Sequence, residues 1–295
     1  MPFIKLSSHD LHYLQLGGGD DGADVEDVVM VHGLAANMAF WYAGLAPVLA
    51  PRYRVTIFDL RGHGASGTPE RGYTAGELSQ DLLALLDHLG IARCHLVAHS
   101  FGGMVAITLA LAHPERISSL VLADVRIHAV QPQLKIRAFG GIPRWRKLLS
   151  EMGIDFDDEH PESGLLLLGL IARLQVERPE LAARLRQAFM GTEGGFGNRA
   201  ARKWLRLIET TSALKDFSAT RTFAESDLAR LEMPVFVIVG ERSVTGPSAQ
   251  ALMAHCPRVR LQAIARAGHF FPLTRRRLFP RLVAGFLQEV SAGSV

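Results

Sequence analysis

The apolar residues of the first 125 positions fall into short, mostly continuous runs separated by longer stretches of mixed character. Four of these runs end just before a polar residue or a histidine: Val28–Val31, Tyr53–Phe58, Cys94–Ala98 and Leu120–Ala123. Runs this short, with little apolar–polar alternation, are typical of strands that are buried on both faces of a parallel sheet. The N-terminus differs, because it alternates as a half-exposed strand does.

The stretches between the runs have helical spacing. The leucines of Ala75–Leu89 fall on one stripe, and Gly102–Ala112 follows the third run directly. The same rhythm returns near the C-terminus, where Pro234–Val239 and Val259–Ile264 read as strands and Leu278–Val290 as a closing helix. Alternation of strands and helices predicts βαβ units with right-handed crossovers.

Residues 126–227 break this rhythm, because they contain helical patterns and no convincing strand. The clearest helical stretches are Leu165–Leu174, Pro179–Phe189 and Ala200–Ile208. We therefore predict an α/β protein with a mostly parallel, doubly wound sheet. Its core is formed by residues 1–125 and 228–295, and a helical cap is inserted at residues 126–227.

Composition and charge exclude several classes of protein. Apolar residues make up 48% of the chain and charged residues 21%, as in an average globular protein. The net charge of +3 is not clustered as a nucleic-acid surface requires. Cys94 and Cys256 are too few for a disulfide framework or a zinc site. No apolar run reaches the roughly 18 residues of a membrane span or resembles a signal peptide. We expect a cytoplasmic protein without cofactor, metal or nucleic-acid partner.

The segment Leu96–Gly103 (LVAHSFGG) is the sharpest chemical signal. A predicted strand runs into a small-x-Ser-x-Gly turn, with Ala98 and Gly102 as the small residues, and a helix follows at once. Such a turn holds a serine above the sheet edge, where the N–H groups of the helix N-terminus can stabilise an oxyanion. The pattern predicts that Ser100 is a nucleophile.

Three further motifs occur in a fixed order around this turn: His32-Gly33-Leu34, the D-x-R-G-x-G-x-S loop over Asp59–Ser66, and the histidine loop over Ala267–Pro272. In these motifs and their order the chain resembles the α/β-hydrolase fold family over nearly its full length. The predicted insertion also falls where that family has its helical cap. The resemblance implies an enzyme that needs no cofactor or metal.

The resemblance also implies a role for each matching residue. Ser100 is expected to be the nucleophile and His269 the general base. The backbone N–H groups of Leu34 and Phe101 are expected to form the oxyanion hole. For His32 and His63 we expect structural hydrogen bonds, and for His99 packing beside the pocket.

The third member of the triad departs from the family pattern. The usual acid follows the Pro234–Val239 strand in a G-x-x-D motif, but here Gly240–Ser243 ends in serine. Asp124 stands at the end of the predicted strand Leu120–Ala123, which follows the helix after Ser100, and it could supply the carboxylate. This arrangement resembles that of haloalkane dehalogenases. Glu241 is a second candidate, and a dyad or an inactive site is a third. We favour Asp124.

A serine nucleophile indicates an acyl-enzyme, whereas dehalogenases and epoxide hydrolases of the family use aspartate at this position. We therefore predict a serine hydrolase of the esterase or thioesterase type, which transfers an acyl group to water. Its substrate is a small carboxylic ester or related acyl compound with an apolar part. Part of the apolar cap residues, which include Leu165–Leu168 and Trp204, is expected to cover the active-site mouth, and most of them are expected to form the cap's own core. One alternative is a thioesterase or cyclase that acts on an acyl chain bound to an acyl carrier protein. Another, motivated by Ser243, is a non-enzymatic ligand-binding module.

Overall fold

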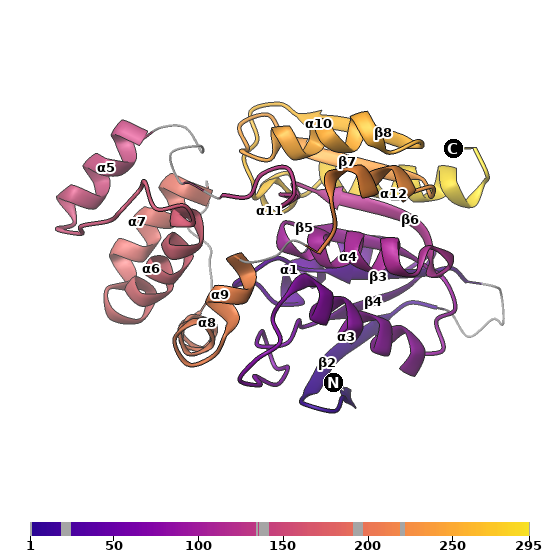
Figure 1. Ribbon diagram of the computed structural model, residues 1–295, viewed down its shortest axis with the longest axis horizontal. Helices are drawn as coiled ribbons and strands as arrows, with labels where there is room; N and C mark the ends of the chain where they lie inside the picture. The colour runs from indigo at the N-terminus through magenta and orange to yellow at the C-terminus, as the bar shows by residue number, and fades with distance from the viewer. Residues whose placement is uncertain are drawn as a thin grey trace.

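A central sheet organises the computed structural model, which describes residues 2–18, 25–133, 135, 142–190, 197–218 and 222–294. In this part of the chain the sheet has eight strands in the order β1-β2-β4-β3-β5-β6-β7-β8 (Figure 1). The strands are β1 Phe3–Lys5, β2 Asp10–Leu16, β3 Asp27–Val31, β4 Arg54–Phe58, β5 Cys94–His99, β6 Ile117–Ala123, β7 Val235–Gly240 and β8 Val259–Ile264. In this order, all neighbouring strands from β4 to β8 are parallel to one another. The prediction of a mostly parallel sheet is confirmed.

The N-terminal alternation forms two strands rather than one. β1 pairs antiparallel with β2, and β2 pairs antiparallel with β4. The chain turns between them, where the N–H of Leu6 donates to the carbonyl of His9 at 2.9 Å. This hairpin forms one edge of the sheet.

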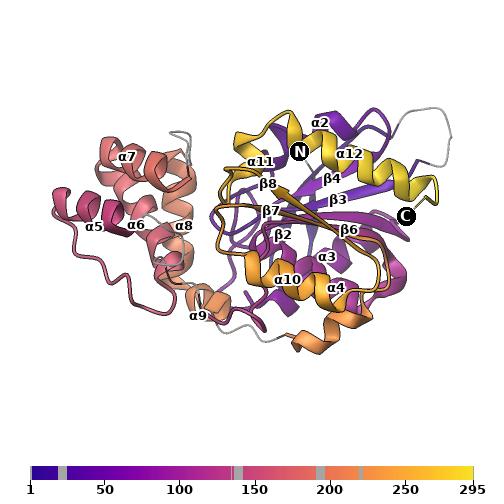
Figure 2. The same ribbon diagram turned by 90° about the horizontal axis from the view of Figure 1, so that it is seen from above.

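Helices cover both faces of the sheet, which explains why every residue of β3, β5 and β7 is buried (Figure 2). One face carries α3 Ala75–His88, α4 Phe101–Ala112 and α10 Gly246–His255. The other carries α1 Ala39–Tyr42, α2 Leu45–Leu49, α11 Phe271–Thr274 and α12 Leu278–Ser291. Two short 3-10 helices, Pro114–Arg116 and Glu225–Arg230, lead into β6 and toward β7. None of the described helices is long and apolar enough to cross a membrane.

The helical insertion lies beyond one end of the sheet in both views (Figures 1 and 2). Its helices are α5 Ile142–Glu151, α6 Ser163–Glu177, α7 Pro179–Met190, α8 Asn198–Thr210 and α9 Ala213–Ser218. Buried leucines and an isoleucine of α5, α6 and α7 form a small core of their own, among them Leu149, Ile171 and Leu185. The predicted span 126–227 also includes residues 134, 136–141, 191–196 and 219–221, which lie outside the described residues.

Successive strands are added to the sheet in opposite directions around β3, because β4 lies on one side of β3 and β5 lies on the other. The switch point is therefore between β3 and β5. Ligands of open α/β sheets bind at the carboxyl ends of the strands beside such a reversal. The carboxyl ends of β3 and β5 lead to Gly33 and Ser100, so the topology brings two of the predicted motifs together.

Candidate active site

Ser100 occupies a sharp turn between β5 and α4. Its backbone angles are φ 55° and ψ −127°, which place a non-glycine residue at positive φ. A Cβ atom at Gly102 would lie 2.6 Å from the carbonyl oxygens of Val31 and His32, and one at Gly103 would lie 2.2 Å from the Val125 side chain. The helix can pack this closely behind Ser100 only because both positions are glycine.

The structure brings Ser100, His269 and Asp124 together from three distant segments. The Nε2 atom of His269 lies 3.0 Å from Ser100 Oγ, and its Nδ1 atom lies 2.6 Å from Asp124 Oδ2. An ionised carboxylate has no proton to give, so Nδ1–H donates to Asp124 and Nε2 is left to accept from the hydroxyl. The Asp124 side chain is fully buried, whereas that of His269 remains 18% exposed.

Asp124 is held by donors from β7 and the loop that follows it. The N–H of Gly240 donates to Oδ1 at 2.8 Å, and the hydroxyl of Ser243 donates to Oδ2. Burial by itself would raise the pKa of Asp124, but its hydrogen bond and electrostatic contact with His269, together with these two donors, hold the pKa below the ordinary aspartate value. Ser243, which stands where the family usually has its acid, therefore acts as a hydrogen-bond partner of the carboxylate.

Glu241, the alternative acid, lies elsewhere. Its side chain is exposed, and its Oε2 atom accepts from the N–H of Arg266 at 2.7 Å. The sequence left Asp124 and Glu241 both open, and the structure brings only Asp124 to the His269 ring.

The backbone N–H groups of Leu34 and Phe101 flank the serine. Gly33 approaches so closely that a Cβ atom there would be 3.0 Å from Ser100 Cβ. Phe101 is the first residue of α4, so its N–H has no acceptor within the helix. Neither N–H donates to another group in the part of the chain that the structure describes. Leu34 and Phe101 both line the cavity that contains Ser100.

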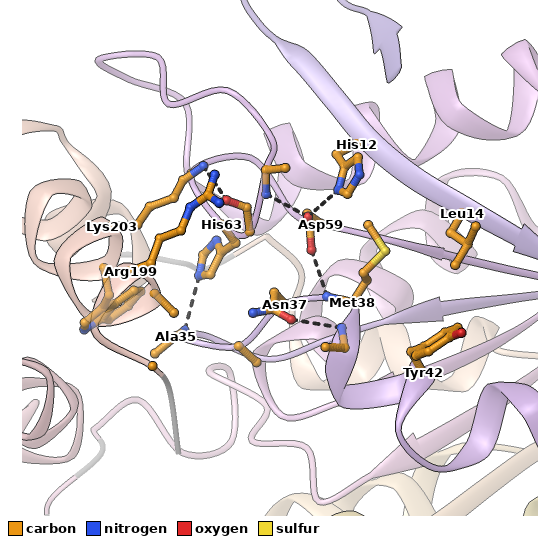
Figure 3. A pocket seen from close by; sticks show the side chains of 18 of the residues that line it. His12, Leu14, Ala35, Asn37, Met38, Tyr42, Asp59, His63, Arg199 and Lys203 are labelled. Carbon is orange, nitrogen blue, oxygen red and sulfur yellow. Dashed lines mark hydrogen bonds and ion pairs between the residues drawn. The ribbon is translucent and has the colours of Figure 1, made fainter. Parts of the chain in front are cut away.

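The Asp59–Ser66 loop supports the segment from Ala35 to Met38, which follows Leu34 in the chain (Figure 3). Nε2 of His63 accepts from the N–H of Ala35 at 3.2 Å, and Asp59 Oδ1 accepts from the N–H of Met38 at 2.8 Å. Asp59 Oδ2 also lies 2.7 Å from His12 Nδ1. The loop therefore fixes the backbone on the C-terminal side of Leu34.

His99 packs beneath the His269 loop. Its ring stacks on Phe40 at 4.7 Å between centroids, and its Nε2–H donates to the backbone oxygen of His269 at 3.1 Å. Burial, with a smaller contribution from His269, lowers the pKa of His99 to about 3. His99 is therefore neutral near pH 7 and holds His269 through the backbone.

A cavity of about 90 Å³ opens at Ser100 and His269. Its apolar wall comes from Leu34, Phe101, Leu165, Leu168, Phe217, Val244 and Phe270. Its polar wall contains Arg126, His128, Glu162 and Thr245. Sequence reasoning missed this polar wall, because Glu162 lies 36 positions after Arg126 and reaches it only through the placement of α6.

A larger cavity of about 680 Å³ is lined by residues 35–39, the Asp59 loop and α8 (Figure 3). Trp204, one of the apolar residues of the predicted cap, is buried and lines this second cavity. Neither Ser100 nor His269 lines it, so the smaller cavity is the one that offers a nucleophile. The described residues contain no group of three or more His, Cys, Asp or Glu side chains that could hold a metal ion.

Comparison with known proteins agrees with this architecture. The sequence model of the alpha/beta hydrolase fold matches residues 28–166. A protein of Variovorax paradoxus strain S110 named "Putative carbamate hydrolase RutD" is 39% identical over 115 residues, which cover 39% of this chain and 42% of that protein. This match therefore spans less than half of the relative's length.

Two other similarities extend over nearly the whole chain. A protein of the same name from Pseudomonas savastanoi pv. phaseolicola is 28% identical over 282 residues, or 95% of this chain and 98% of that protein. The solved structure of Est816, described as an N-acyl homoserine lactone degrading enzyme, is 26% identical and has a TM-score of 0.65, with 97% of this chain and 100% of that chain covered. The chain has the α/β-hydrolase fold, and it is similar in sequence to members of that family over nearly its full length.

Proposed function

We propose that the protein is a serine hydrolase that cleaves a small carboxylic ester or related acyl compound through an acyl-enzyme. The observation that carries the proposal is the continuous hydrogen-bonded chain from Ser100 Oγ through His269 to the buried Asp124 carboxylate. A hydroxyl, an imidazole and a carboxylate in this order are the groups that acyl transfer requires.

In the proposed reaction, Ser100 Oγ attacks the carbonyl carbon of the substrate while its proton passes to His269 Nε2. The N–H groups of Leu34 and Phe101 receive the negative charge that develops on the carbonyl oxygen. His269 then gives the proton to the departing alkoxide, and the C–O bond breaks to leave the acyl group on Ser100. Water attacks this ester with His269 again as the base, which restores the enzyme and releases the acid.

Asp124 has a positioning and electrostatic role in this scheme. Its hydrogen bond to Nδ1 keeps the tautomer in which Nε2 can accept a proton, and its charge stabilises the imidazolium that forms. The lowered pKa of Asp124 keeps the carboxylate ionised at neutral pH. The role therefore falls to Asp124, while Ser243 fixes the orientation of the carboxylate.

The size of the cavity supports a short acyl group. Its volume of about 90 Å³ is small beside the roughly 150 Å³ of a closed cavity that holds benzene, which favours a short acyl group over a long one. This favours the hydrolase over a thioesterase or cyclase that acts on a carrier-bound acyl chain, if that chain is long. A short carbamate is a second candidate substrate, supported by the full-length similarity to the RutD protein.

The test is the release of p-nitrophenol from the acetate, butanoate and octanoate esters and from the N-methylcarbamate. We expect a burst of one p-nitrophenol per protein chain with the short esters, and slower reaction with octanoate. Ser100→Ala should abolish the burst. Ser79→Ala, which changes a buried serine hydroxyl bonded to Gly76 in α3, is the matched control and should retain it. Absence of Ser100-dependent release with every ester would refute the proposal.

A further inference from the structure

The turn that carries Leu34 depends on contacts from outside it. Residues 33–36 form a turn in which the N–H of Ala36 donates to the carbonyl of Gly33 at 3.4 Å, which is a long hydrogen bond. Ala35 adopts a φ of 57°, a left-handed conformation that is strained for a residue with a Cβ atom. Such strain persists only where the surrounding structure holds the backbone in place.

Two buried histidines hold this turn. The Nδ1 atom of His32 lies 2.8 Å from the carbonyl oxygen of Gly33. The Nε2 atom of His63 lies 3.2 Å from the backbone nitrogen of Ala35, a contact that a dashed line marks in Figure 3. Both distances are shorter than the hydrogen bond within the turn, so the histidines contribute the closer contacts.

The opposite nitrogen of each ring reaches the Asp59–Ser66 loop. His32 Nε2 lies 3.1 Å from the backbone nitrogen of Leu60, and His63 Nδ1 lies 3.0 Å from the carbonyl oxygen of Arg61. The two ring centroids are 5.3 Å apart, in an edge-to-face arrangement. Each ring therefore bridges the turn to one of two consecutive residues of the loop.

The backbone partners fix which nitrogen of each ring carries the proton. A backbone N–H can only donate, so both Nε2 atoms are unprotonated, and a carbonyl can only accept, so both Nδ1 atoms carry hydrogen. The residues His32 and His63 are 0% and 4% exposed. Burial lowers the pKa of both rings, that of His63 to about 3. Both imidazoles are therefore neutral near pH 7 and keep one donor and one acceptor each.

These contacts fix the peptide units on both sides of Leu34. The N–H of Leu34 and the carbonyl of Gly33 belong to the same planar peptide unit and point in opposite directions. By holding that carbonyl, His32 sets the direction of the Leu34 N–H. His63 holds the next peptide unit through the N–H of Ala35. Leu34 itself lines the smaller cavity, which contains the nucleophile.

We propose that His32 and His63 are positioning residues, which aim the N–H of Leu34 at the oxyanion by donating from His32 Nδ1 and accepting at His63 Nε2. This inference rests on the proposed function, because that function assigns the Leu34 N–H to the oxyanion. A preorganised donor stabilises the transition state only when it points at the developing charge. Rotation of this peptide unit should therefore lower kcat and leave substrate binding nearly unchanged.

Asparagine and glutamine separate the two contacts of each ring. The amide nitrogen of asparagine takes the position of Nδ1, and the amide oxygen of glutamine reaches that of Nε2. His32→Asn therefore keeps the hydrogen bond to Gly33, and His32→Gln loses it. The order reverses at residue 63, where His63→Gln keeps the hydrogen bond from Ala35 and His63→Asn loses it. Each variant loses one of two hydrogen bonds, so a purely structural role predicts no such reversal.

The test measures kcat and KM for p-nitrophenyl butanoate and Ki for 1,1,1-trifluoropentan-2-one. Ser100 Oγ adds to the carbonyl carbon of this ketone, its proton passes to His269, and the ketone oxygen becomes an oxyanion. We expect kcat to be about 10- to 100-fold lower in His32→Gln than in His32→Asn, which is less than the cost of removing a whole oxyanion donor. The same factor should separate His63→Asn from His63→Gln. Ki should rise in parallel, and KM should change by less than about 3-fold.

His95 provides the matched control pair. It is a buried histidine near the start of β5, its Nδ1 atom lies 2.8 Å from Ser119 Oγ, and it does not line the Ser100 cavity. His95→Asn and His95→Gln should therefore have equal kcat values. Urea unfolding of all six variants measures how far each substitution lowers the stability of the fold.

The opposite results are equally specific. Values of kcat that are equal within each pair, that run in the reverse order, or that follow the urea midpoints would overturn the positioning role. With Ser100-dependent turnover intact in the wild type, they would leave the proposed function standing. Failure of all four variants at His32 and His63 to fold would show a structural role alone and would also overturn the inference. Absence of Ser100-dependent turnover with every ester in the wild type would remove both proposals.

Discussion

The sharpest single perturbation is Asp124→Asn, which changes one oxygen to an amide nitrogen and keeps the side-chain volume. Asp124 Oδ2 now accepts from two donors, His269 Nδ1–H and the Ser243 hydroxyl, while Oδ1 accepts from the N–H of Gly240. An asparagine keeps its oxygen toward Gly240, since that N–H is fixed in the backbone. Its NH2 group then faces His269.

This arrangement sets the size of the effect. A facing NH2 group must donate to Nδ1, so the proton of His269 moves to Nε2 and the ring can no longer accept from Ser100. The charge that stabilises the imidazolium is lost as well. Loss of tautomer and charge together lowers kcat by about 10⁴-fold in a serine protease triad, which is roughly 5.5 kcal/mol of barrier.

The assay is the second-order rate of acylation by p-nitrophenyl acetate, measured by stopped flow for wild type, Asp124→Asn and Glu241→Gln. We expect a fall of about 10³- to 10⁴-fold for Asp124→Asn and no change for Glu241→Gln, whose parent side chain binds the Arg266 backbone. Far-ultraviolet circular dichroism shows whether both variants fold. An unchanged rate for folded Asp124→Asn, or abolition by Glu241→Gln, would refute the assignment of the acid.

Three further predictions concern the Asp124 carboxylate and the two buried cysteines. Ser243→Ala removes one donor to a buried carboxylate, so the free energy of unfolding should fall by about 1–3 kcal/mol, and acylation should slow far less than in Asp124→Asn. An equal fall in the acylation rate in both variants would contradict this. The folded-state pKa of Asp124 is lower than the unfolded value of about 3.9, so its carboxylate stabilises the fold above about pH 4, and this contribution is lost as the pH falls through the lower folded value. Urea unfolding should therefore show a stability gap between wild type and Asp124→Asn that narrows between pH 7 and pH 3, and a gap independent of pH would contradict it. Burial raises the pKa of Cys94, and also raises that of Cys256 to about 12, so iodoacetamide at pH 7.5 should label neither thiol in the native protein and both in urea; labelling of native protein would contradict the burial.

Much of the fold could be predicted because burial on two faces leaves a direct mark on the sequence. The run Val28–Val31 and the run Cys94–Ala98 are apolar or small at nearly every position, since helices cover both sides of the strands that contain them. The N-terminal segment was harder. An edge hairpin and a single strand share the same alternation, and only the turn at Leu6–His9 separates them.

Some residues of the candidate site could be predicted from the sequence, and others could not. Ser100 and His269 could be predicted because each belongs to a short contiguous motif, which can be recognised without knowing the fold. The acid stayed open, because its contact with His269 spans 145 positions and depends on β6 and β7 being neighbours in the sheet. The Arg126–Glu162 contact left no mark in the sequence, because it depends on how the insertion sits against the strand ends.

The most direct test of the account is the mass of the intact protein after treatment with diethyl p-nitrophenyl phosphate, followed by peptide mapping. The account predicts one diethylphosphoryl group per chain, located on Ser100 and absent from Ser100→Ala. A native protein that stays unmodified, or a phosphoryl group on another residue, would contradict the claim that Ser100 is the activated nucleophile.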